Sequence, residues 1–198
     1  MLNVIIGLLG LGTIGSGVYE HLLKRDDISV KRILELRRHP CIEHLETSDF
    51  KEILNDAEID TVVELIGGME PAHTFTLQAL RAGKNVVSAN KLMLSHHMEE
   101  ILQTARENGV QYRYDASVGG SIPFLYNLMR HLSADRITAI SGIVNGTTNL
   151  ILDIMQTSPR SFEDVLAQAQ REGYAEANPS SDIDGVDAQC KICIASAV

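Results

Sequence analysis

A short acidic stretch near the C-terminal end combines residue types that can bind a charged substrate and move a proton. Residues 173–187 contain four acids, and Lys191 follows one helical turn after Asp187. A proline and two glycines predict a loop here, whereas the residues from Asp187 onward are typical of a helix, on which Asp187 and Lys191 share a face. Loop acids can then hold a cationic amine while the lysine transfers a proton. The alternative is a solvated acidic loop with an ordinary ion pair.

A glycine-rich turn near the N-terminal end predicts a nucleotide site. Residues 10–15 fit the pattern G-x-G-x-x-G, follow a short apolar strand at residues 3–9 and precede a helix with apolar residues every four positions. The first glycine makes the turn, the second lets backbone approach a pyrophosphate, and the third lets the helix pack on the strand. The predicted dinucleotide-binding residues are Gly10, Gly12, Thr13, Ile14 and Gly15. A tight turn without a ligand is the alternative.

The end of the second predicted strand, at residues 30–36, bears on the choice of dinucleotide. An acid at this point binds the ribose 2′-hydroxyl of NAD, whereas an arginine accommodates the 2′-phosphate of NADP. Glu35 is near, but Arg37 and Arg38 occupy the strand end. The sequence therefore favours NADP(H) and leaves NAD(H) possible. Two arginines on a solvated rim are the alternative.

Strands alternate with helices over the first 115 residues, which predicts an α/β fold with a doubly wound parallel sheet of the Rossmann type. Further strands are expected at residues 61–66, 85–88 and 110–115, and helices at 48–55, 71–82 and 95–108. Lys91 follows a strand, at the edge of the sheet where ligands bind. After Asp115 a partial α+β domain is predicted, with a strand at 136–144 and helices at 150–156 and from 161 to Gly173. We therefore expect a nucleotide domain at 1–130 and a substrate domain at 131–198.

Composition narrows the class of protein. The chain has 198 residues, with 17 basic and 26 acidic residues and a formal net charge of -9. This charge argues against nucleic acid or an anionic membrane as partner, and no apolar run approaches the ~20 residues that span a bilayer. Three cysteines fit a reducing cytosol, so a cytoplasmic location is expected. Cys190 and Cys193 have C-x-x-C spacing, which on a helix favours buried cysteines over a metal site.

Six motifs occur in the order seen in homoserine dehydrogenases, so the sequence resembles that family along nearly its whole length. They are VVELIGG-x-EPA (62–72), VVSANK (86–91), SVGGSIP (117–123), GIVNGTTN (142–149), GYAEANPSSDIDG (173–185) and DAQCK (187–191). The resemblance implies NAD(P)-dependent interconversion of L-homoserine and L-aspartate 4-semialdehyde, in the pathway to threonine, methionine and isoleucine. It also implies a homodimer.

The resemblance assigns roles residue by residue. Lys191 matches the proton-transfer lysine, with Asp187 beside it, and Lys91 matches a lysine near cofactor and substrate. The substrate-binding positions are Glu176 and Asp182, which hold the amino group, and Tyr174, Gly146 and Thr147, which line the pocket. A structural sodium ion is implied at Asp115, Val118, Gly120 and Ile122.

Some positions depart from the family pattern. Ser121 stands where a third glycine is usual and Asn178 where aspartate is usual. Asp115 replaces a glutamate, which shortens its reach toward sodium. The sequence stops inside the helix of Lys191, so we expect a fragment or a short form. Two alternatives stay open: an NADP-binding protein without turnover, and a dehydrogenase of a related amino acid or semialdehyde.

Overall fold

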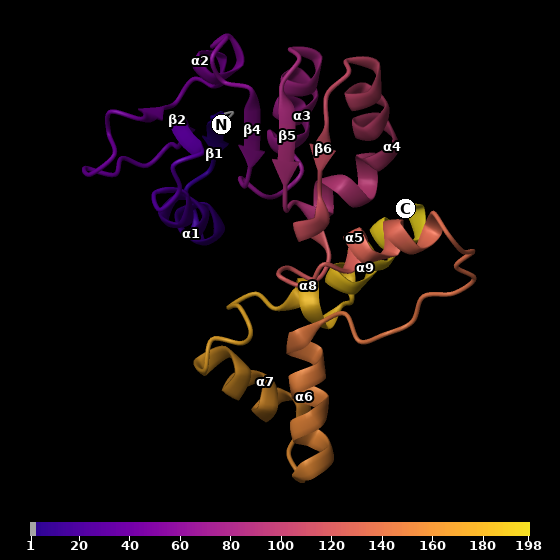
Figure 1. The fold of residues 1–198 in the computed structure, drawn as a ribbon. Coiled ribbons are helices and arrows are strands. Elements are labelled where there is room, and N and C mark those ends of the chain that lie inside the picture. Colours follow the sequence, from indigo (N-terminus) through magenta and orange to yellow (C-terminus); the bar gives the residue numbers. More distant parts are fainter. Residues whose placement is uncertain (1–2) are drawn as a thin grey trace. The chain divides into compact units, whose positions relative to one another are not determined.

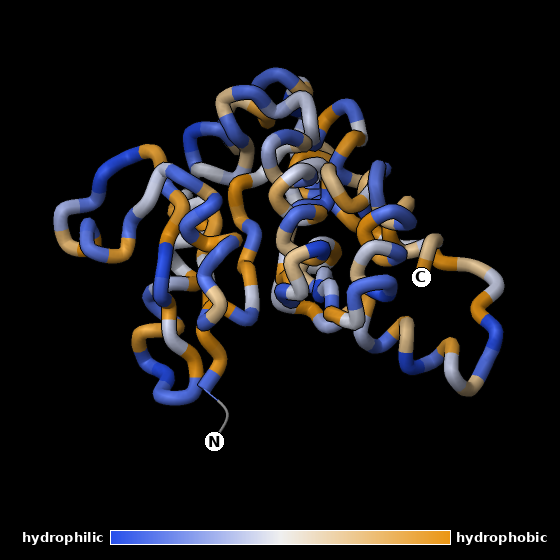
Figure 2. Tube along the Cα trace, turned by 90° about the horizontal axis from the view of Figure 1, so that it is seen from above, coloured by the Kyte–Doolittle hydropathy of each residue, from blue (hydrophilic) through white to orange (hydrophobic). Residues whose placement is uncertain are grey.

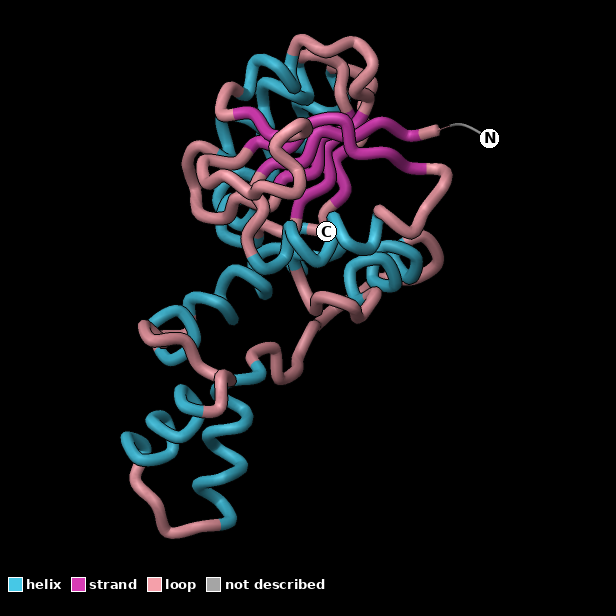
Figure 3. Tube along the Cα trace, turned by 90° about the vertical axis from the view of Figure 1, so that its left-hand side faces the viewer, coloured by secondary structure: helices cyan, strands magenta, loops and turns pink. Residues whose placement is uncertain are grey.

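The computed structural model describes residues 3–198. The chain divides into two compact units, the first ending at Phe124 and the second running from Leu125 to Val198. The first unit contains the sheet, and the second is built of helices and loops (Figures 1 and 3).

The first unit is organised around a six-stranded sheet in which every neighbouring pair is parallel. Its strands are β1 (Val4–Leu9), β2 (Ile28–Leu34), β3 (Glu46–Thr47), β4 (Thr61–Glu64), β5 (Asn85–Ser88) and β6 (Tyr112–Arg113). Their order in the sheet is β3-β2-β1-β4-β5-β6, which is the doubly wound dinucleotide-binding order. The predicted Rossmann-type fold is confirmed.

The strand order reverses between β1 and β4, because the chain leaves β1 toward β2 and β3 and then returns to β4 on the other side. Strand ends diverge at such a point, and ligands of open α/β sheets bind there. The residues that follow β1 and β4 are the glycine turn at 10–15 and the loop at 65–71. The topology thus places the glycine turn and the loop at 65–71 at one edge of the sheet.

Helices cover the sheet, as the apolar patterns predict. They are α1 (Thr13–Leu22), α2 (Phe50–Leu54), α3 (Ala72–Arg81) and α4 (Lys91–Glu107). α2 contacts α3 and α3 contacts α4, so these three form one layer, and right-handed crossovers put α1 on the opposite face. Buried aliphatic residues fill the space between strands and helices, among them Leu8, Ile33, Ile53 and Leu80.

Helix α4 begins four residues earlier than the pattern predicts. The side chain of Asn90 accepts a hydrogen bond from the amide of Met93, 3.1 Å away, and so caps the helix just before Lys91. Asparagine is among the best residues at this position, because it satisfies an amide that has no partner within the helix. Lys91 is therefore the first residue of a helix and not part of a loop.

The second unit contains helices joined by loops. They are α5 (Phe124–Leu132), α6 (Gly146–Thr157), α7 (Phe162–Arg171), α8 (Ser180–Ile183) and α9 (Val186–Ala197). Ser161 caps α7 by accepting from the amide of Asp164, and Gly173 follows the helix at a φ of 80°. α6 packs on α7 and contacts α8, which contacts α9.

The predicted strand at residues 136–144 is wrong. The segment is not helical either, and it forms a loop between α5 and α6. Residues 136–139 alternate between polar and apolar, as in many half-buried strands, but the alternation stops at Ile140. Figure 2 shows hydrophobic and hydrophilic residues mixed along the loops of the chain. A strand also needs a neighbour for its backbone groups, and residues 125–198 contain no other strand to pair with. β6 is likewise shorter than predicted, because the chain turns after Arg113 into the 3-10 helix η1 (Asp115–Ser117).

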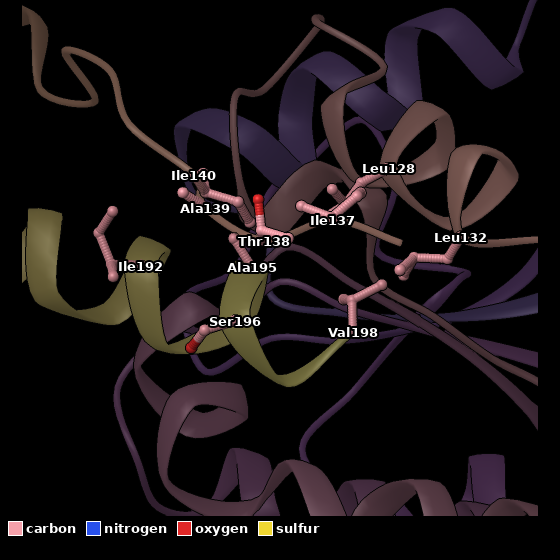
Figure 4. A pocket seen from close by; sticks show the side chains of 10 residues that line it. All are labelled: Leu128, Leu132, Ile137, Thr138, Ala139, Ile140, Ile192, Ala195, Ser196 and Val198. Carbon is pink, nitrogen blue, oxygen red and sulfur yellow. The ribbon is translucent and has the colours of Figure 1, made fainter. Parts of the chain in front are cut away.

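An apolar groove of about 310 Å³ lies within the second unit (Figure 4). Residues 137–140 form one wall, and side chains of α5 and α9 form the others. Thr138 and Ser196 supply its hydroxyl groups, and the rest of the lining is aliphatic. A groove of this composition suits apolar packing and not a charged substrate.

Among residues 3–198 we find no helix that is both long enough and apolar enough to cross a membrane.

Candidate functional site: a dinucleotide cleft and a buried polar cluster

The glycine turn has the shape that a dinucleotide requires. Gly10 has a φ of 90°, and a Cβ added there would lie 2.9 Å from the carbonyl oxygen of Leu65. A Cβ on Gly15 would overlap the Gly10 carbonyl, whereas a Cβ on Gly12 would meet open space. Gly10 and Gly15 are therefore needed for packing of the turn, and Gly12 leaves room for a ligand beside the N-terminus of α1.

The N-terminus of α1 can donate hydrogen bonds to a phosphate. Its first residue is Thr13, and Gly12 at the cap position has no side chain to satisfy the first amides. Such amides and the positive end of the helix dipole attract anions. Both Thr13 and Ile14 are exposed, so the first turn of the helix is open to solvent. The turn thus fits a pyrophosphate.

The Glu35 carboxylate holds the glycine turn through backbone amides. Its Oε2 accepts from the amide of Leu11 at 2.9 Å, and its Oε1 accepts from the amides of Leu36 at 2.8 Å and Arg37 at 3.0 Å. Partial burial raises the pKa of this carboxyl, but the three amide donors together lower it below its ordinary value. Arg37 and Arg38 are exposed at the same strand end.

A cavity of about 500 Å³ lies between these segments. Its lining comes from the glycine turn, the end of β2, the loop after β4 and the start of α3. It includes Gly12, Glu35, Arg37, Ile66 and Phe75. Apolar side chains and backbone thus form a slot beside the phosphate-binding turn, which suits the adenosine half of a dinucleotide.

A buried polar network fixes the neighbouring loop and the start of α4. Glu64, fully buried at the end of β4, accepts from the hydroxyl of Ser88 at 2.6 Å and from the amides of Ile66 and Gly67. Asn90 donates to the carbonyl of Gly68 at 2.7 Å. The network therefore joins the ends of β4 and β5 and sets the backbone position of the following residue, Lys91.

The residues matched to a sodium site form a tight turn. η1 is followed by Gly119 and Gly120 at φ angles of 86° and 55°, which curl the backbone around the segment. The carbonyl oxygen of Ile122 accepts from the amide of Phe124 at 2.7 Å and keeps a second lone pair. Carbonyl oxygens are suitable ligands for a hard cation, so the donor type fits sodium.

A cluster of four polar side chains forms the centre of the second unit. Lys191 Nζ donates to Asp187 Oδ2 at 2.7 Å and to the carbonyl oxygen of Val144 at 2.6 Å. Asn145 Nδ2 donates to the same Asp187 oxygen at 2.9 Å and to Asp182 Oδ1 at 2.7 Å. The loop before α6, the helix α8 and the helix α9 thus meet through Asn145.

Burial makes this cluster unlike a surface ion pair. Asp187 is 3% exposed, and Asn145 is 8% exposed. A buried carboxylate is tolerated only when donors satisfy it, and Asp187 has the ammonium of Lys191 and the amide of Asn145. The acidic stretch therefore does more than form a solvated ion pair.

The other predicted substrate residues differ in their hydrogen bonds and in their exposure to solvent. Thr147 donates its hydroxyl to the carbonyl of Tyr174 at 3.0 Å, which ties the start of α6 to the loop after α7. The Tyr174 side chain is 62% exposed. Glu176 is exposed, and its backbone carbonyl accepts from Gln170. Gly146 is the first residue of α6.

Two organising residues were not singled out from the sequence. Asn145 caps α6 and bridges two acids, and its position before G-T-T-N is the sequence signal for a cap. Glu64 ends an otherwise apolar strand, and a lone acid there signals a buried, satisfied carboxylate. Neither signal reveals the partners, which come from distant parts of the chain.

The sheet order, the glycine turn and the cavity define a Rossmann-type dinucleotide-binding protein. A family model described as "Homoserine dehydrogenase, NAD binding domain" matches residues 10–115, and one described as "Homoserine dehydrogenase" matches residues 123–198. The chain belongs to the homoserine dehydrogenase family.

Individual relatives agree with this assignment. Homoserine dehydrogenase of Bacillus subtilis (strain 168) is 40% identical over 203 residues, which cover 96% of this chain and 47% of that protein. The structure of a homoserine dehydrogenase from Thiobacillus denitrificans matches with a TM-score of 0.90 at 41% identity, over 98% of this chain and 48% of the other. A hyperthermophilic archaeal homoserine dehydrogenase in complex with NADPH shares the fold, with a TM-score of 0.86 at 24% identity over 98% of this chain and 68% of its own. The chain spans about half the length of the curated relatives it matches.

Proposed function

We propose that this chain supports the NAD(P)-dependent interconversion of L-homoserine and L-aspartate 4-semialdehyde. The observation that carries the proposal is the buried cluster of Lys191, Asp187, Asn145 and Asp182. It offers a proton donor and carboxylates, the groups that an amino acid with a primary alcohol requires. Residues 1–130 would bind the cofactor and residues 131–198 the substrate.

The substrate is a zwitterion, so its binding needs both signs of charge. Asp182 and Glu176 would receive its ammonium group, and Lys91 its carboxylate, through charge-assisted hydrogen bonds. The second carboxylate oxygen of Asp182 carries no hydrogen bond from the described residues, which leaves it for the substrate. Tyr174, Gly146 and Thr147 would line the pocket around the carbon chain.

Lys191 would act as the proton donor during reduction of the aldehyde. When bound, the nicotinamide supplies the hydride to the aldehyde carbon. An ammonium group has three N–H donors, and in Lys191 two are given to Val144 and Asp187. The third can protonate the developing alkoxide, which becomes the alcohol oxygen of homoserine. In the oxidative direction the same nitrogen accepts the proton.

The cofactor preferred by this site would be NADP(H), with NAD(H) as a weaker ligand. Two features support the choice: the Glu35 carboxylate is occupied by three backbone amides, and Arg37 and Arg38 are exposed beside the cavity. Replacing both arginines by alanine is expected to raise KM for NADPH by on the order of tenfold, about 1.4 kcal/mol, with little change for NADH. Equal effects on the two cofactors would contradict the preference.

A sodium ion and a second chain would complete the assembly. The turn that holds Asp115, Val118, Gly120 and Ile122 supplies oxygen donors suited to sodium. Association as a homodimer is supported by the apolar groove of the second unit, because apolar grooves of soluble proteins often mark interfaces. The molar mass in solution tests whether the chain forms a homodimer. Repeating the measurement with potassium in place of sodium as the only alkali cation tests whether the dimer needs sodium.

The reaction itself is tested by following NADPH oxidation with L-aspartate 4-semialdehyde on the purified 198-residue chain, and NADP reduction with L-homoserine. Turnover with these substrates, and slower turnover with shorter or longer semialdehydes, is the expected result. Cofactor binding without turnover would favour an NADP-binding protein. Faster turnover with another semialdehyde would favour a related dehydrogenase.

A further inference from the structure

Two histidines and two glutamates gather on the surface of the first unit, on α3, α4 and the loop before α3. The Nε2 atom of His73 lies 3.1 Å from Oε2 of Glu100, and Nδ1 of His97 lies 3.6 Å from the same oxygen. One ligand-type atom from each of these three side chains lies within 4.8 Å of the other two. On the other side of the His73 ring, Oε1 of Glu70 lies 3.4 Å from Nδ1.

These separations match those between the ligands of a tetrahedral metal ion. Zinc binds histidine nitrogen and carboxylate oxygen at about 2.1 Å, so two ligands at the tetrahedral angle are about 3.4 Å apart. The distances of 3.1 and 3.6 Å from Glu100 to His73 and His97 bracket this value. An imidazole binds a metal in the plane of its ring, and the two rings are stacked nearly parallel. At least one ring would therefore turn out of the stack so that all three atoms point at one ion.

The position of Glu70 is a second observation that points to a metal. Histidines that bind metals usually give their other ring N–H to a carboxylate, which fixes the tautomer and the ring orientation. Glu70 Oε1 lies 3.4 Å from His73 Nδ1 and can accept its proton. In the tautomer with the proton on Nδ1, Nε2 is the lone-pair nitrogen and lies on the side of Glu100.

The backbone of α4 is also distorted at one of the candidate ligands. His97 has φ and ψ angles of -128° and 19°, which are not helical, inside the span Lys91–Glu107. Its ring stacks on that of His73, with centroids 3.8 Å apart and planes inclined by 19°. Kinks within helices usually have a local cause, and no proline lies in this span. Here the kink lies at the residue whose ring stacks on His73.

We propose that His73, His97 and Glu100 bind a divalent transition metal of the zinc type, with Glu70 orienting His73. Imidazole and carboxylate ligands suit zinc, whereas magnesium prefers oxygen ligands and keeps much of its water. The His73 and His97 side chains are 14% and 32% exposed, so the site opens to solvent. Three protein ligands leave a fourth position for water. The ion would fasten α3 to α4, the helix that starts at Lys91.

The first test is zinc binding by the full chain after metal removal, measured by competition with a chromogenic chelator. Replacing His73 or His97 by asparagine, or Glu100 by glutamine, is expected to weaken zinc binding by more than ~100-fold. Glu70→Gln is expected to weaken it by roughly 10- to 100-fold, as for other orienting partners. The matched controls are His96→Asn and Glu99→Gln, which change exposed neighbours of the same types and are expected to leave the affinity unchanged.

Cobalt(II) gives a readout that does not depend on enzyme activity. We expect the strong visible absorption of a four-coordinate cobalt site in the chain and in both control variants, and its loss in Glu100→Gln. Magnesium should not compete. The proposal is overturned if His97→Asn binds zinc as well as His96→Asn does. It is also overturned if cobalt gives a thiolate charge-transfer band, because the cysteines would then hold the metal.

Discussion

In the first unit the groups that would contact the cofactor are mostly backbone amides, whereas in the second unit the proposed chemical groups are side chains joined by Asn145. The amides of the glycine turn are fixed by strand order and by close packing at Gly10 and Gly15. The two acids Asp182 and Asp187 are instead fixed by hydrogen bonds from the Asn145 side chain, and Lys191 is fixed by donating to Asp187 and to the backbone carbonyl of Val144. A single side-chain change should therefore damage the second site more than the first.

The largest effect is expected for Lys191→Ala. This variant lacks the proposed proton donor, and loss of general acid catalysis typically lowers the rate by roughly 10²- to 10⁴-fold. Turnover of L-aspartate 4-semialdehyde with NADPH measures it. Lys51→Ala, on the exposed surface of α2, is the control and should turn over like the unaltered chain. A Lys191→Ala variant with more than half of the original turnover would end the assignment.

Asn145→Ala should come next. It leaves two carboxylates without their shared amide donor and lets Lys191 shift, and a displacement of about 1 Å can cost on the order of 10²-fold in rate. Lost hydrogen bonds to charged groups also cost about 1.5–3 kcal/mol of stability each. Kinetics and urea unfolding are compared with Asn149→Ala, which alters an exposed asparagine one turn further along α6. Equal behaviour of the two variants would show that Asn145 does not organise the site.

The glycine turn offers a milder pair of changes that separates binding from packing. Gly12→Ala adds a Cβ in open space where the pyrophosphate would lie, so we expect NADPH affinity to fall on the order of tenfold with the unfolding free energy little changed. Gly15→Ala places its Cβ against the Gly10 carbonyl and should lower stability. Calorimetric titration and urea unfolding measure the two quantities. If Gly12→Ala bound NADPH normally, the predicted phosphate site would be wrong.

The smallest effect concerns acid stability through Glu35. Its pKa is below the ordinary value of 4.5 in the folded chain, because three amide donors outweigh partial burial. Its contribution to stability is therefore present above about pH 4.5 and is lost as the pH falls through the lower folded pKa. The stability difference between the unaltered chain and Glu35→Gln should shrink over this range. Urea unfolding midpoints at several pH values measure this stability difference, with Glu43→Gln at an exposed glutamate as the control. A difference between the unaltered chain and Glu35→Gln that stays constant with pH would contradict the prediction.

The two units also differ in how far the sequence predicts them. Apolar runs predict β1, β2, β4 and β5, and parallel pairing then brings the glycine turn and Lys91 to one edge of the sheet. The two-residue strand β3 was not predicted, because Glu46 and Thr47 form no apolar run. The direction of Glu35 was not predictable, because the same acid can bind a ribose or backbone amides. Only the distance to Leu11 decides between them.

In the second unit the pattern at residues 136–144 is that of a strand, but the segment has no strand beside it. Periodicity describes one chain segment and says nothing about its neighbour. Likewise Lys191 and Asp187 were predictable as a helical pair, whereas Asn145 is more than 40 positions away from both. Sequence patterns therefore do not predict which side chains pair when they lie far apart along the chain.

The separation of roles between the two units is tested most directly by the NADPH dissociation constant of Lys191→Ala, measured by calorimetry beside that of the unaltered chain. We predict values that agree within about twofold, since Lys191 lines neither the glycine turn nor the cavity beside it, while turnover in the same samples is lost. A dissociation constant that rises in proportion to the loss of turnover would contradict the account, because Lys191 would then belong to the cofactor site.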